Sequence, residues 1–211
     1  MKKTLYLLAI FFGSIITANA QVTFKPGIRA GANFSRLTQN DDLNEKYSTI
    51  TDFYIAGFGE LKLSKFYALQ PEIGYSREGS KKEYVTVTYN PYNDSNVTQN
   101  QTAEFKVQYL TLNLINKFFI KKVYFQVGPS LDINVSPENK VSDNNYSYNP
   151  YNYNYYANYN DYSAIDVGFV GGFGFDFTKN FGVEARIKKG VVDVYDGQDA
   201  ITYQVGVTAK F

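Results

Sequence analysis

The 211-residue sequence contains no cysteine, no histidine and no tryptophan, and only one methionine. Without cysteine, no disulfide can staple the fold. Without histidine or cysteine, the sequence cannot build a Ser-His-Asp triad, a Cys-His pair or the usual zinc sites, and no pair of carboxylates stands out as an acid and base. We therefore expect a protein that is not an enzyme and has no cofactor, no catalytic residue and no metal site.

Two further features are missing. After the first 20 residues there is no run of about 18 apolar residues, which excludes a helical membrane protein. The 21 basic and 20 acidic residues nearly cancel, so no broad positive field attracts nucleic acid. The protein is not expected to bind nucleic acid.

The first 20 residues have the pattern of a secretory signal peptide. Lys2 and Lys3 precede the apolar run at 5–12, and Ala18-Asn19-Ala20 forms an A-x-A cleavage site. A transmembrane anchor is the alternative, but the apolar run is short for a span. We expect residues 1–20 to be cleaved and residues 21–211 to form one domain.

The remaining sequence alternates between apolar and polar residues. This period of two predicts eight strands. Their expected ranges are 22–36, 52–63, 66–79, 104–118, 122–135, 164–178, 180–189 and 200–211. The pattern predicts an all-β fold, an eight-stranded antiparallel up-and-down transmembrane β-barrel with long extracellular loops.

The expected connections alternate between short and long. The short ones lie near 64–65, 120–121 and 179–180, and the long polar ones at 37–51, 80–103, 136–163 and 190–199. Short periplasmic turns and long external loops are typical of outer-membrane barrels. With an even number of strands, both termini are expected in the periplasm, the loops outside the cell, and outer-membrane lipid around the wall.

Alternation alone leaves open which face points outward. A soluble periplasmic lipocalin-like barrel that binds a small apolar ligand would show the same period with its apolar side chains inside. Here the polar set is rich in glycine and in charges of both signs, which favours a narrow, crowded lumen. The aromatic residues near the predicted periplasmic strand ends favour an interfacial girdle. They are Phe24, Tyr67, Phe118, Phe125, Phe177, Phe181 and Phe211.

The inward face is predicted to hold a set of charged residues that must pair when buried. Arg29 is expected to pair with Glu60 or with the last strand, and Glu184 and Arg186 with Asp176 or Lys210. An ion-paired structural plug is the favoured interpretation, because eight strands leave an interior that side chains fill; a small pore or a rim enzyme is the alternative. The set comprises Arg29, Glu60, Lys62, Glu72, Asp132, Asp166, Asp176, Glu184, Arg186, Lys188 and Lys210.

Two regions depart from a simple pattern of one alternating strand per crossing of the membrane. On the fourth strand, Phe105 and Val107 have the opposite parity to the leucines at 110–114, so we expect a bulge near Tyr109. Residues 81–89 also alternate and are expected to continue the third strand above the membrane as a ribbon, pairing with 102–108. Such an exposed ribbon edge can recruit a partner strand.

The segment 143–162 consists almost entirely of tyrosine and asparagine, and the phrase YNPYN occurs at both 89–93 and 148–152. Tyrosine and asparagine are favoured in binding loops. Two interpretations stay open: a surface that contacts an extracellular protein or glycan, or a hydrated loop that only shields the barrel. The expected contact residues are Tyr89, Tyr92, Tyr148, Tyr151, Tyr153, Tyr155, Tyr156 and Tyr159.

Several motifs resemble the PorT-like outer-membrane β-barrel family of Bacteroidetes. They are the export signal, residues 27–35 (GIRAGANFS), residues 69–76 (LQPEIGYS) and the terminal Lys210-Phe211. The resemblance implies a porin-like barrel at the cell surface with no shared catalytic residues. It also implies insertion by the barrel-assembly machinery, with Phe211 as the assembly signal.

Overall fold

The computed structural model describes residues 22–38, 46–90, 95–136, 141–143, 163–192 and 198–211. The expected signal peptide, residues 1–20, lies outside them. Within the described residues, ten strands form one antiparallel sheet. They are β1 (Thr23–Leu37), β2 (Lys46–Ser48), β3 (Ile50–Lys62), β4 (Tyr67–Asn90), β5 (Ser95–Ile120), β6 (Val123–Asn134), β7 (Val141–Asp143), β8 (Ile165–Asp176), β9 (Phe181–Gly190) and β10 (Ala200–Lys210).

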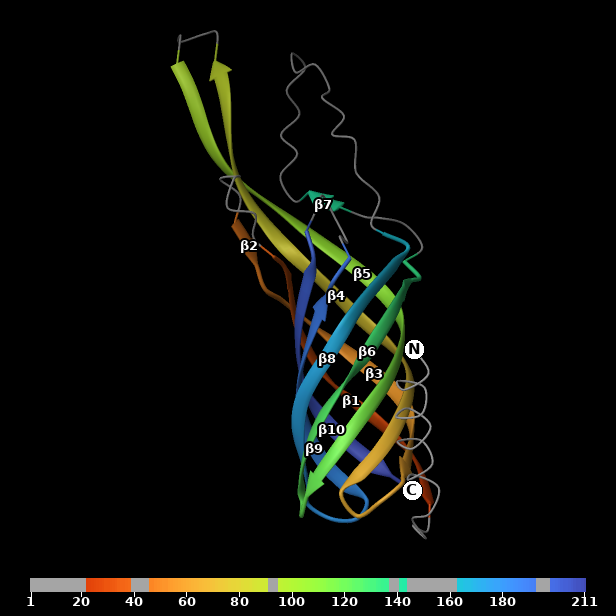
Figure 1. Ribbon diagram of the computed structural model, residues 1–211. Helices are drawn as coiled ribbons and strands as arrows, with labels where there is room; N and C mark the ends of the chain where they lie inside the picture. Colours follow the sequence, from red (N-terminus) through yellow and green to blue (C-terminus); the bar gives the residue numbers. More distant parts are fainter. Residues whose placement is uncertain (1–21, 39–45, 91–94, 137–140, 144–162, 193–197) are drawn as a thin grey trace, which may run out of the picture.

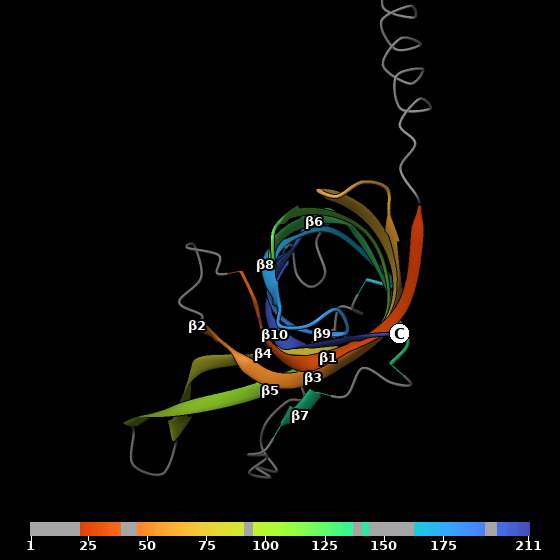
Figure 2. The same cartoon turned by 90° about the horizontal axis from the view of Figure 1, so that it is seen from below.

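The sheet closes on itself. Leaving aside the three-residue strands β2 and β7, each of the other eight strands pairs with its neighbours in the chain, and β1 pairs with β10 to complete the ring. Figure 1 shows the tilted strands from the side, and Figure 2 shows the ring from below. The predicted eight-stranded antiparallel barrel is confirmed. No helix among the described residues is long and apolar enough to cross a membrane.

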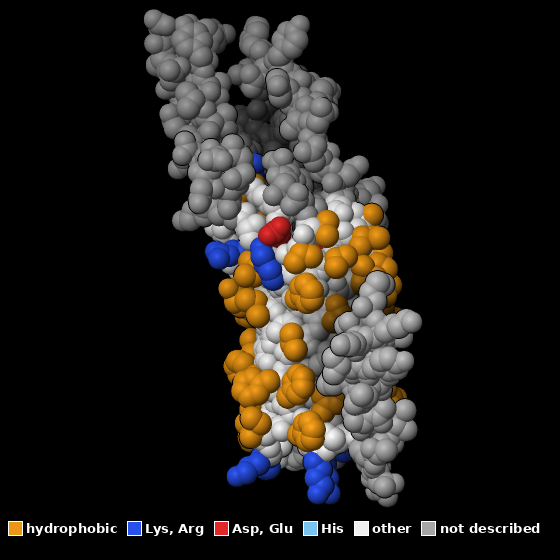
Figure 3. All heavy atoms as spheres, in the orientation of Figure 1, with side chains coloured by type: hydrophobic (Ala, Val, Ile, Leu, Met, Phe, Trp, Pro, Cys, Tyr) orange, Lys and Arg blue, Asp and Glu red, His pale blue; other side chains and the backbone are white. Residues whose placement is uncertain are grey.

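Alternation along the strands separates an apolar exterior from a polar interior. On β9, Phe181, Val183 and Ile187 are exposed, whereas Glu184 and Arg186 are buried. Figure 3 shows hydrophobic side chains around the barrel wall and lysine or arginine side chains at its lower end. Since a lipocalin-like ligand barrel needs apolar side chains inside, this arrangement is the reverse of the soluble alternative.

The apolar exterior is too extensive for a surface that faces water. Phe169, Phe173 and Val207 are each 59% exposed, and similar side chains recur on all eight strands of the barrel. Soluble monomers rarely expose a contiguous apolar patch of more than a few hundred Å². A surrounding hydrocarbon phase removes that area from water, and the closed ring leaves no unpaired barrel edge inside it.

Three tight turns join strands at the end of the barrel where the C-terminus lies (Figure 1). They span 63–66, 121–122 and 177–180, close to the predicted positions. Lys121 has a positive φ of 61°, a conformation that the two-residue turn requires. The Thr178 hydroxyl accepts hydrogen bonds from the backbone N–H of Asn180 at 3.2 Å and of Phe181 at 3.0 Å.

The bulge expected near Tyr109 is not present. β5 keeps one register against β4 from Phe118 to Ser95, and its register against β6 is the same on both sides of Leu114. Val107 and Tyr109 are 3% and 2% exposed, so both lie on the inward face. The prediction was wrong because it required every apolar side chain to face lipid, although apolar and aromatic side chains also fill the lumen.

β4 and β5 extend far beyond the other strands. They contain 24 and 26 residues, whereas the other barrel strands contain 10 to 15. Their outer parts form a two-stranded hairpin, which we call the ribbon, residues 77–90 and 95–108 (Figure 1). The ribbon was expected, but its register differs: residues 81–89 pair with 96–104 rather than with 102–108.

Glycines inside the barrel make room for two inward tyrosines. A Cβ atom on Gly174 would lie 2.2 Å from the Tyr124 ring, and one on Gly206 would lie 2.2 Å from the Tyr54 hydroxyl oxygen. Real Cβ atoms essentially never approach so closely. Gly174 is therefore required unless the Tyr124 ring shifts, and Gly206 is required in any case, because a Cβ atom there would also lie 2.4 Å from the backbone oxygen of Ala30. The glycine-rich inward face therefore reflects close packing in a narrow lumen.

Candidate functional site in the barrel lumen

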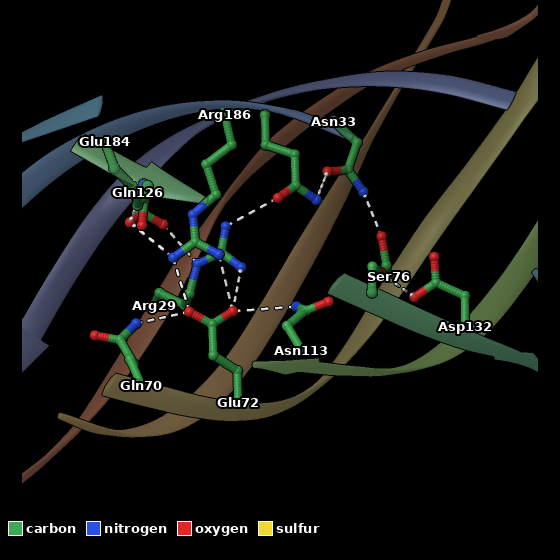
Figure 4. Close-up of polar contacts among 12 residues, drawn as sticks. Arg29, Asn33, Gln70, Glu72, Ser76, Asn113, Gln126, Asp132, Glu184 and Arg186 are labelled. Atoms are coloured by element: carbon green, nitrogen blue, oxygen red, sulfur yellow. Dashed lines mark hydrogen bonds and ion pairs between the residues drawn. The ribbon is translucent and has the colours of Figure 1, made fainter. Parts of the chain in front are cut away.

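Four charged side chains from three strands form the centre of the lumen (Figure 4). We call Arg29, Glu72, Glu184 and Arg186 the central cluster. Arg186 binds Glu72 with two parallel hydrogen bonds of 2.8 Å, and it also contacts Glu184 at 3.1 Å. The Arg29 side chain joins the same two carboxylates, at 2.5 Å from Glu184 and 3.2 Å from Glu72. The two arginines balance the two glutamates in a closed set of ion pairs.

Neutral side chains add hydrogen bonds to the central cluster, although the Arg186 Nε atom has no partner among the described residues. Gln70 donates to Glu72 at 2.6 Å, Asn113 donates to it at 3.1 Å, and Gln126 donates to Glu184 at 3.3 Å. Arg29 donates to Gln204 at 2.9 Å. All these side chains are buried or nearly so. Because buried charges are stable only when paired and hydrogen-bonded, the contact of each carboxylate with both arginines makes the burial of these four charges possible.

A second group, the turn-side cluster, lies between the central cluster and the tight turns. Lys210 contacts Glu60 and Asp176, each at 2.9 Å, and Lys117 lies 3.6 Å from Glu60. The Lys117 ammonium also lies 4.2 Å from the centre of the Tyr124 ring, close enough for a cation–π interaction. Two lysines again balance two carboxylates.

A third group, the loop-side cluster, lies toward the other end of the barrel. Lys188 contacts Glu78 at 2.5 Å and forms a short ion pair with Asp132. Glu78 also accepts hydrogen bonds from Thr202 at 2.7 Å and Ser76 at 2.8 Å. One lysine therefore serves two carboxylates.

Asp166 adds a further carboxylate to the loop-side cluster. It is directly opposite Asp132 in the β6–β8 ladder and is only 2% exposed. Among the described residues, its Oδ1 atom has no hydrogen-bond partner. Like charges directly across a ladder repel. The loop-side cluster therefore has one lysine against three carboxylates and differs from the two balanced clusters.

The structure places the sequence-predicted lumen residues in these clusters, with different partners in two cases. Arg29 forms ion pairs with Glu72 and Glu184 rather than with Glu60, and it also donates a hydrogen bond to Gln204 on the last strand, which was the other expected contact. Arg186 contacts Glu72 and Glu184 rather than Asp176. Lys62 is only half-buried at the turn end, with its ammonium 4.7 Å from the ring centre of Phe119.

Two charged residues of the lumen, Glu78 and Lys117, were not among the predicted set. Glu78 shares its parity with Glu72 on β4, and Lys117 shares its parity with Thr111 on β5, so the alternation carried the signal for both. Lys117 was missed because the expected bulge made the inward face of the fourth strand uncertain. Glu78 was missed because the third strand was expected to end at residue 79, directly after it.

The lumen leaves little space for a substrate. Two cavities beside the network have volumes of ≈ 20 Å³ and ≈ 10 Å³. A cavity of this size holds about one water molecule. Within the described ranges, no group of three or more acidic residues is arranged to hold a metal ion. The geometry therefore supports structural ion pairs rather than an acid, base or metal centre.

Most of the tyrosines expected to contact a partner are not among the described residues. Tyr92, Tyr148, Tyr151, Tyr153, Tyr155, Tyr156 and Tyr159 lie outside the described residues. The backbone of Tyr89 lies near the tip of the ribbon, paired with Asn96. Phe211 directly follows β10, is 70% exposed, and donates its backbone N–H to Pro26 at 2.8 Å.

The sequence matches the family model described as "Outer membrane protein beta-barrel domain" over residues 19–196, which is most of the chain. The chain belongs to this family. An outer-membrane location follows from the family, and an apolar exterior is typical of such barrels. A search of proteins with curated functions gives no match.

Solved outer-membrane barrels resemble this one distantly. Ail, the attachment invasion locus protein of Yersinia pestis, is 11% identical with a TM-score of 0.46, covering 89% of this chain and 98% of its own. Neisserial surface protein A is 12% identical, TM-score 0.49, with coverage of 88% and 97%. OprG from Pseudomonas aeruginosa is 10% identical, TM-score 0.49, with coverage of 91% and 98%. Similarities at this level carry no argument about function.

Proposed function

We propose that this outer-membrane barrel is a closed, non-enzymatic anchor that presents the ribbon and its tyrosine-rich connections to a partner at the cell surface. The observation that carries the proposal is the contrast between a filled lumen and a protruding ribbon. A membrane-spanning β-strand needs only about 9–11 residues. β4 and β5, with 24 and 26 residues, are far longer than insertion requires.

The filled lumen argues against the pore and rim-enzyme alternatives. The central cluster crosses the barrel from β1 to β4 and β9 and is hydrogen-bonded on both sides. An ion that crossed the lumen would have to separate these pairs, and removing one partner of a buried pair costs about 3–5 kcal/mol. The clusters stiffen the barrel that holds the ribbon.

We propose that both termini and the tight turns lie in the periplasm and that the ribbon lies outside the cell. The turns are short, as on the periplasmic side of such barrels, and the ribbon is at the opposite end (Figure 1). The YNPYN segments at 89–93 and 148–152 fall, in the sequence, where β4 is joined to β5 and where β7 is joined to β8. Their composition favours contact with an extracellular protein or a glycan.

We also propose that the barrel-assembly machinery recognises Phe211 and that the chain is a PorT-like member of its family. The exposed aromatic ring at the end of β10 and the motif at 27–35, which lies on the adjacent strand β1, support this. Deletion of Phe211 is expected to lower the amount of protein in the outer membrane. Equal recovery of the deleted and full chains would contradict an assembly signal.

Orientation is tested by labelling intact cells with a membrane-impermeant maleimide. Because the chain has no cysteine, a single cysteine at Val87 reports the ribbon and one at Lys65 reports a tight turn. We expect labelling of Val87→Cys in intact cells and of Lys65→Cys only after the outer membrane is opened. The reverse pattern would contradict the proposed orientation.

Closure is tested by recording from the purified protein in planar lipid bilayers. A change in gel mobility on boiling first verifies that the barrel has folded. We expect no discrete conductance steps from the folded protein. Reproducible steps that change on substitution of Arg186 or Glu72 would support a small pore and contradict the closed anchor.

A further inference from the structure

The outer half of the ribbon has two edges that no described strand covers. β2 pairs with β4 only at residues 81–83, and β7 pairs with β5 only at residues 103–105. Farther out, among the described strands, residues 84–90 pair only with residues 95–101. Each edge therefore presents a row of backbone N–H and C=O groups, which is a template for another strand.

The molecule itself shows that the ribbon accepts added strands. β2 and β7 have only three residues each, yet one has joined the outer edge of β4 and the other that of β5. Both additions are antiparallel and stop where the bare edges begin. Backbone pairing at these edges is thus compatible with the twist and position of the ribbon.

Charge distinguishes the covered part of the β4 edge from the bare part. The part beside β2 contains Lys81, Lys82 and Glu83, whereas residues 84–90 (YVTVTYN) contain no charge and no proline. Exposed edges are normally protected by lysine, proline or a bulge. β-Branched and aromatic residues, which favour strands, dominate this stretch, whereas β5 at 95–102 (SNVTQNQT) has fewer of them. The bare β4 edge is therefore the better template.

We propose that two copies of this chain pair through their β4 edges at residues 84–90, in antiparallel orientation. The inference rests on the proposed position of the ribbon outside the membrane. A two-stranded hairpin is marginally stable in water, and joining two of them gives a four-stranded sheet. The stretch carries no charge that would oppose its own copy, and an antiparallel ladder has the two-fold axis that a closed dimer of identical edges requires.

The antiparallel orientation determines where the two barrels lie. Each ribbon leaves its barrel in the direction in which β4 runs, so antiparallel β4 strands bring the ribbons together from opposite directions. The barrels then lie at the two ends of the shared sheet and sit in two facing membranes. The ribbon pair is thus a homotypic contact between membranes.

The first test is clustering of lipid vesicles that carry the full-length folded protein, followed by light scattering. The variant Thr86→Lys/Thr88→Lys charges the β4 edge, and the matched control Val97→Lys/Gln99→Lys charges the paired positions on β5. We expect clustering of the unmodified protein, a decrease of about tenfold or more in the β4 variant because like charges then face each other, and little change in the control. Equal loss in both variants, or no clustering at all, would overturn the proposal.

The second test is disulfide formation between vesicles. Val87→Cys introduces a single cysteine near the middle of the β4 stretch, and Thr98→Cys introduces one at the residue paired with it on β5. We expect a cross-linked dimer for Val87→Cys when two vesicle populations with different tags are mixed, and little for Thr98→Cys. Dimers that form only within one population would show copies side by side and contradict a contact between facing membranes.

The two proposals fail in different ways. If the closed anchor is wrong, the protein conducts or the ribbon cysteine is not labelled from outside. If only the pairing is wrong, heat-dependent mobility and outside labelling of Val87→Cys persist, while clustering and cross-linking are absent.

Discussion

The central and loop-side clusters lie at different levels of one lumen, and both their residue types and their charge balance differ. Two arginines neutralise two glutamates in the centre, whereas Lys188 alone serves Glu78 and Asp132 while Asp166 remains without a hydrogen-bond partner at Oδ1 among the described residues. The centre is therefore a stable plug, and the loop-side end carries an electrostatic cost. Charge is thus balanced in the central and turn-side clusters but not at the loop side, although Asp132 and Asp166 are as fully buried as the central side chains.

The largest effect is expected from breaking the central cluster. Arg186→Met leaves Glu72 and Glu184 buried with one arginine, and we expect a loss of about 3–5 kcal/mol in the free energy of unfolding. Urea unfolding in detergent, followed by gel mobility or circular dichroism, measures it. Lys189→Met is the control: this half-exposed lysine is on the same strand as Arg186 and pairs with Asp199 just before β10, so its loss should change stability by less than about 1 kcal/mol.

A double variant tests whether Glu72 and Arg186 contribute to stability as one ion pair. Glu72→Leu/Arg186→Met removes one charge of each sign and leaves Arg29 paired with Glu184 at 2.5 Å. Apolar replacement of a whole buried pair is often neutral or stabilising, so the double variant should recover most of the stability that the single one loses. If the two substitutions were additive, the pair would not act as one unit.

A smaller loss of stability is expected from disturbing the packing beside the central cluster. Gly174→Ala places a methyl group against Tyr124, whose hydroxyl lies 3.4 Å from Glu184, and should destabilise the barrel by about 1–3 kcal/mol. At Gly171 on the same strand a Cβ atom meets nothing within 4 Å. Gly171→Ala should therefore be tolerated in the same unfolding assay, and equal losses at both sites would contradict a packed lumen.

The smallest effect is expected in the loop-side cluster and has the opposite sign. Asp166→Asn removes a buried charge that faces Asp132, and it should stabilise the protein by about 1 kcal/mol. Asp132 lies directly across the ladder and pairs with Lys188, so Asp132→Asn weakens that ion pair and should destabilise the protein. Thermal unfolding of the two variants under identical conditions compares them, and a loss of stability in Asp166→Asn would show that this carboxylate has a partner.

The sequence predicted the eight strands, the tight turns and the inward position of most charged residues. It did so because a β-strand has a side-chain period of two, so each residue's face follows from its neighbours along the chain. Two predictions were wrong. A bulge was expected at Tyr109 because inward apolar and aromatic side chains changed the apparent alternation, and the ribbon was expected in a different register. Both features depend on pairing and packing against the neighbouring strands, and the alternation along a single strand gives no information about these.

The strands and the face of each residue could be predicted from the chain alone, since both properties are local. The pairing of the charges could not. Arg29 contacts Glu72 and Glu184 across the lumen rather than Glu60 on the adjacent strand, because closure of the barrel fixes the stagger of all eight strands together. The physical reason is that a ring has no free register: once β1 pairs with β10, the heights of all inward side chains are set relative to one another.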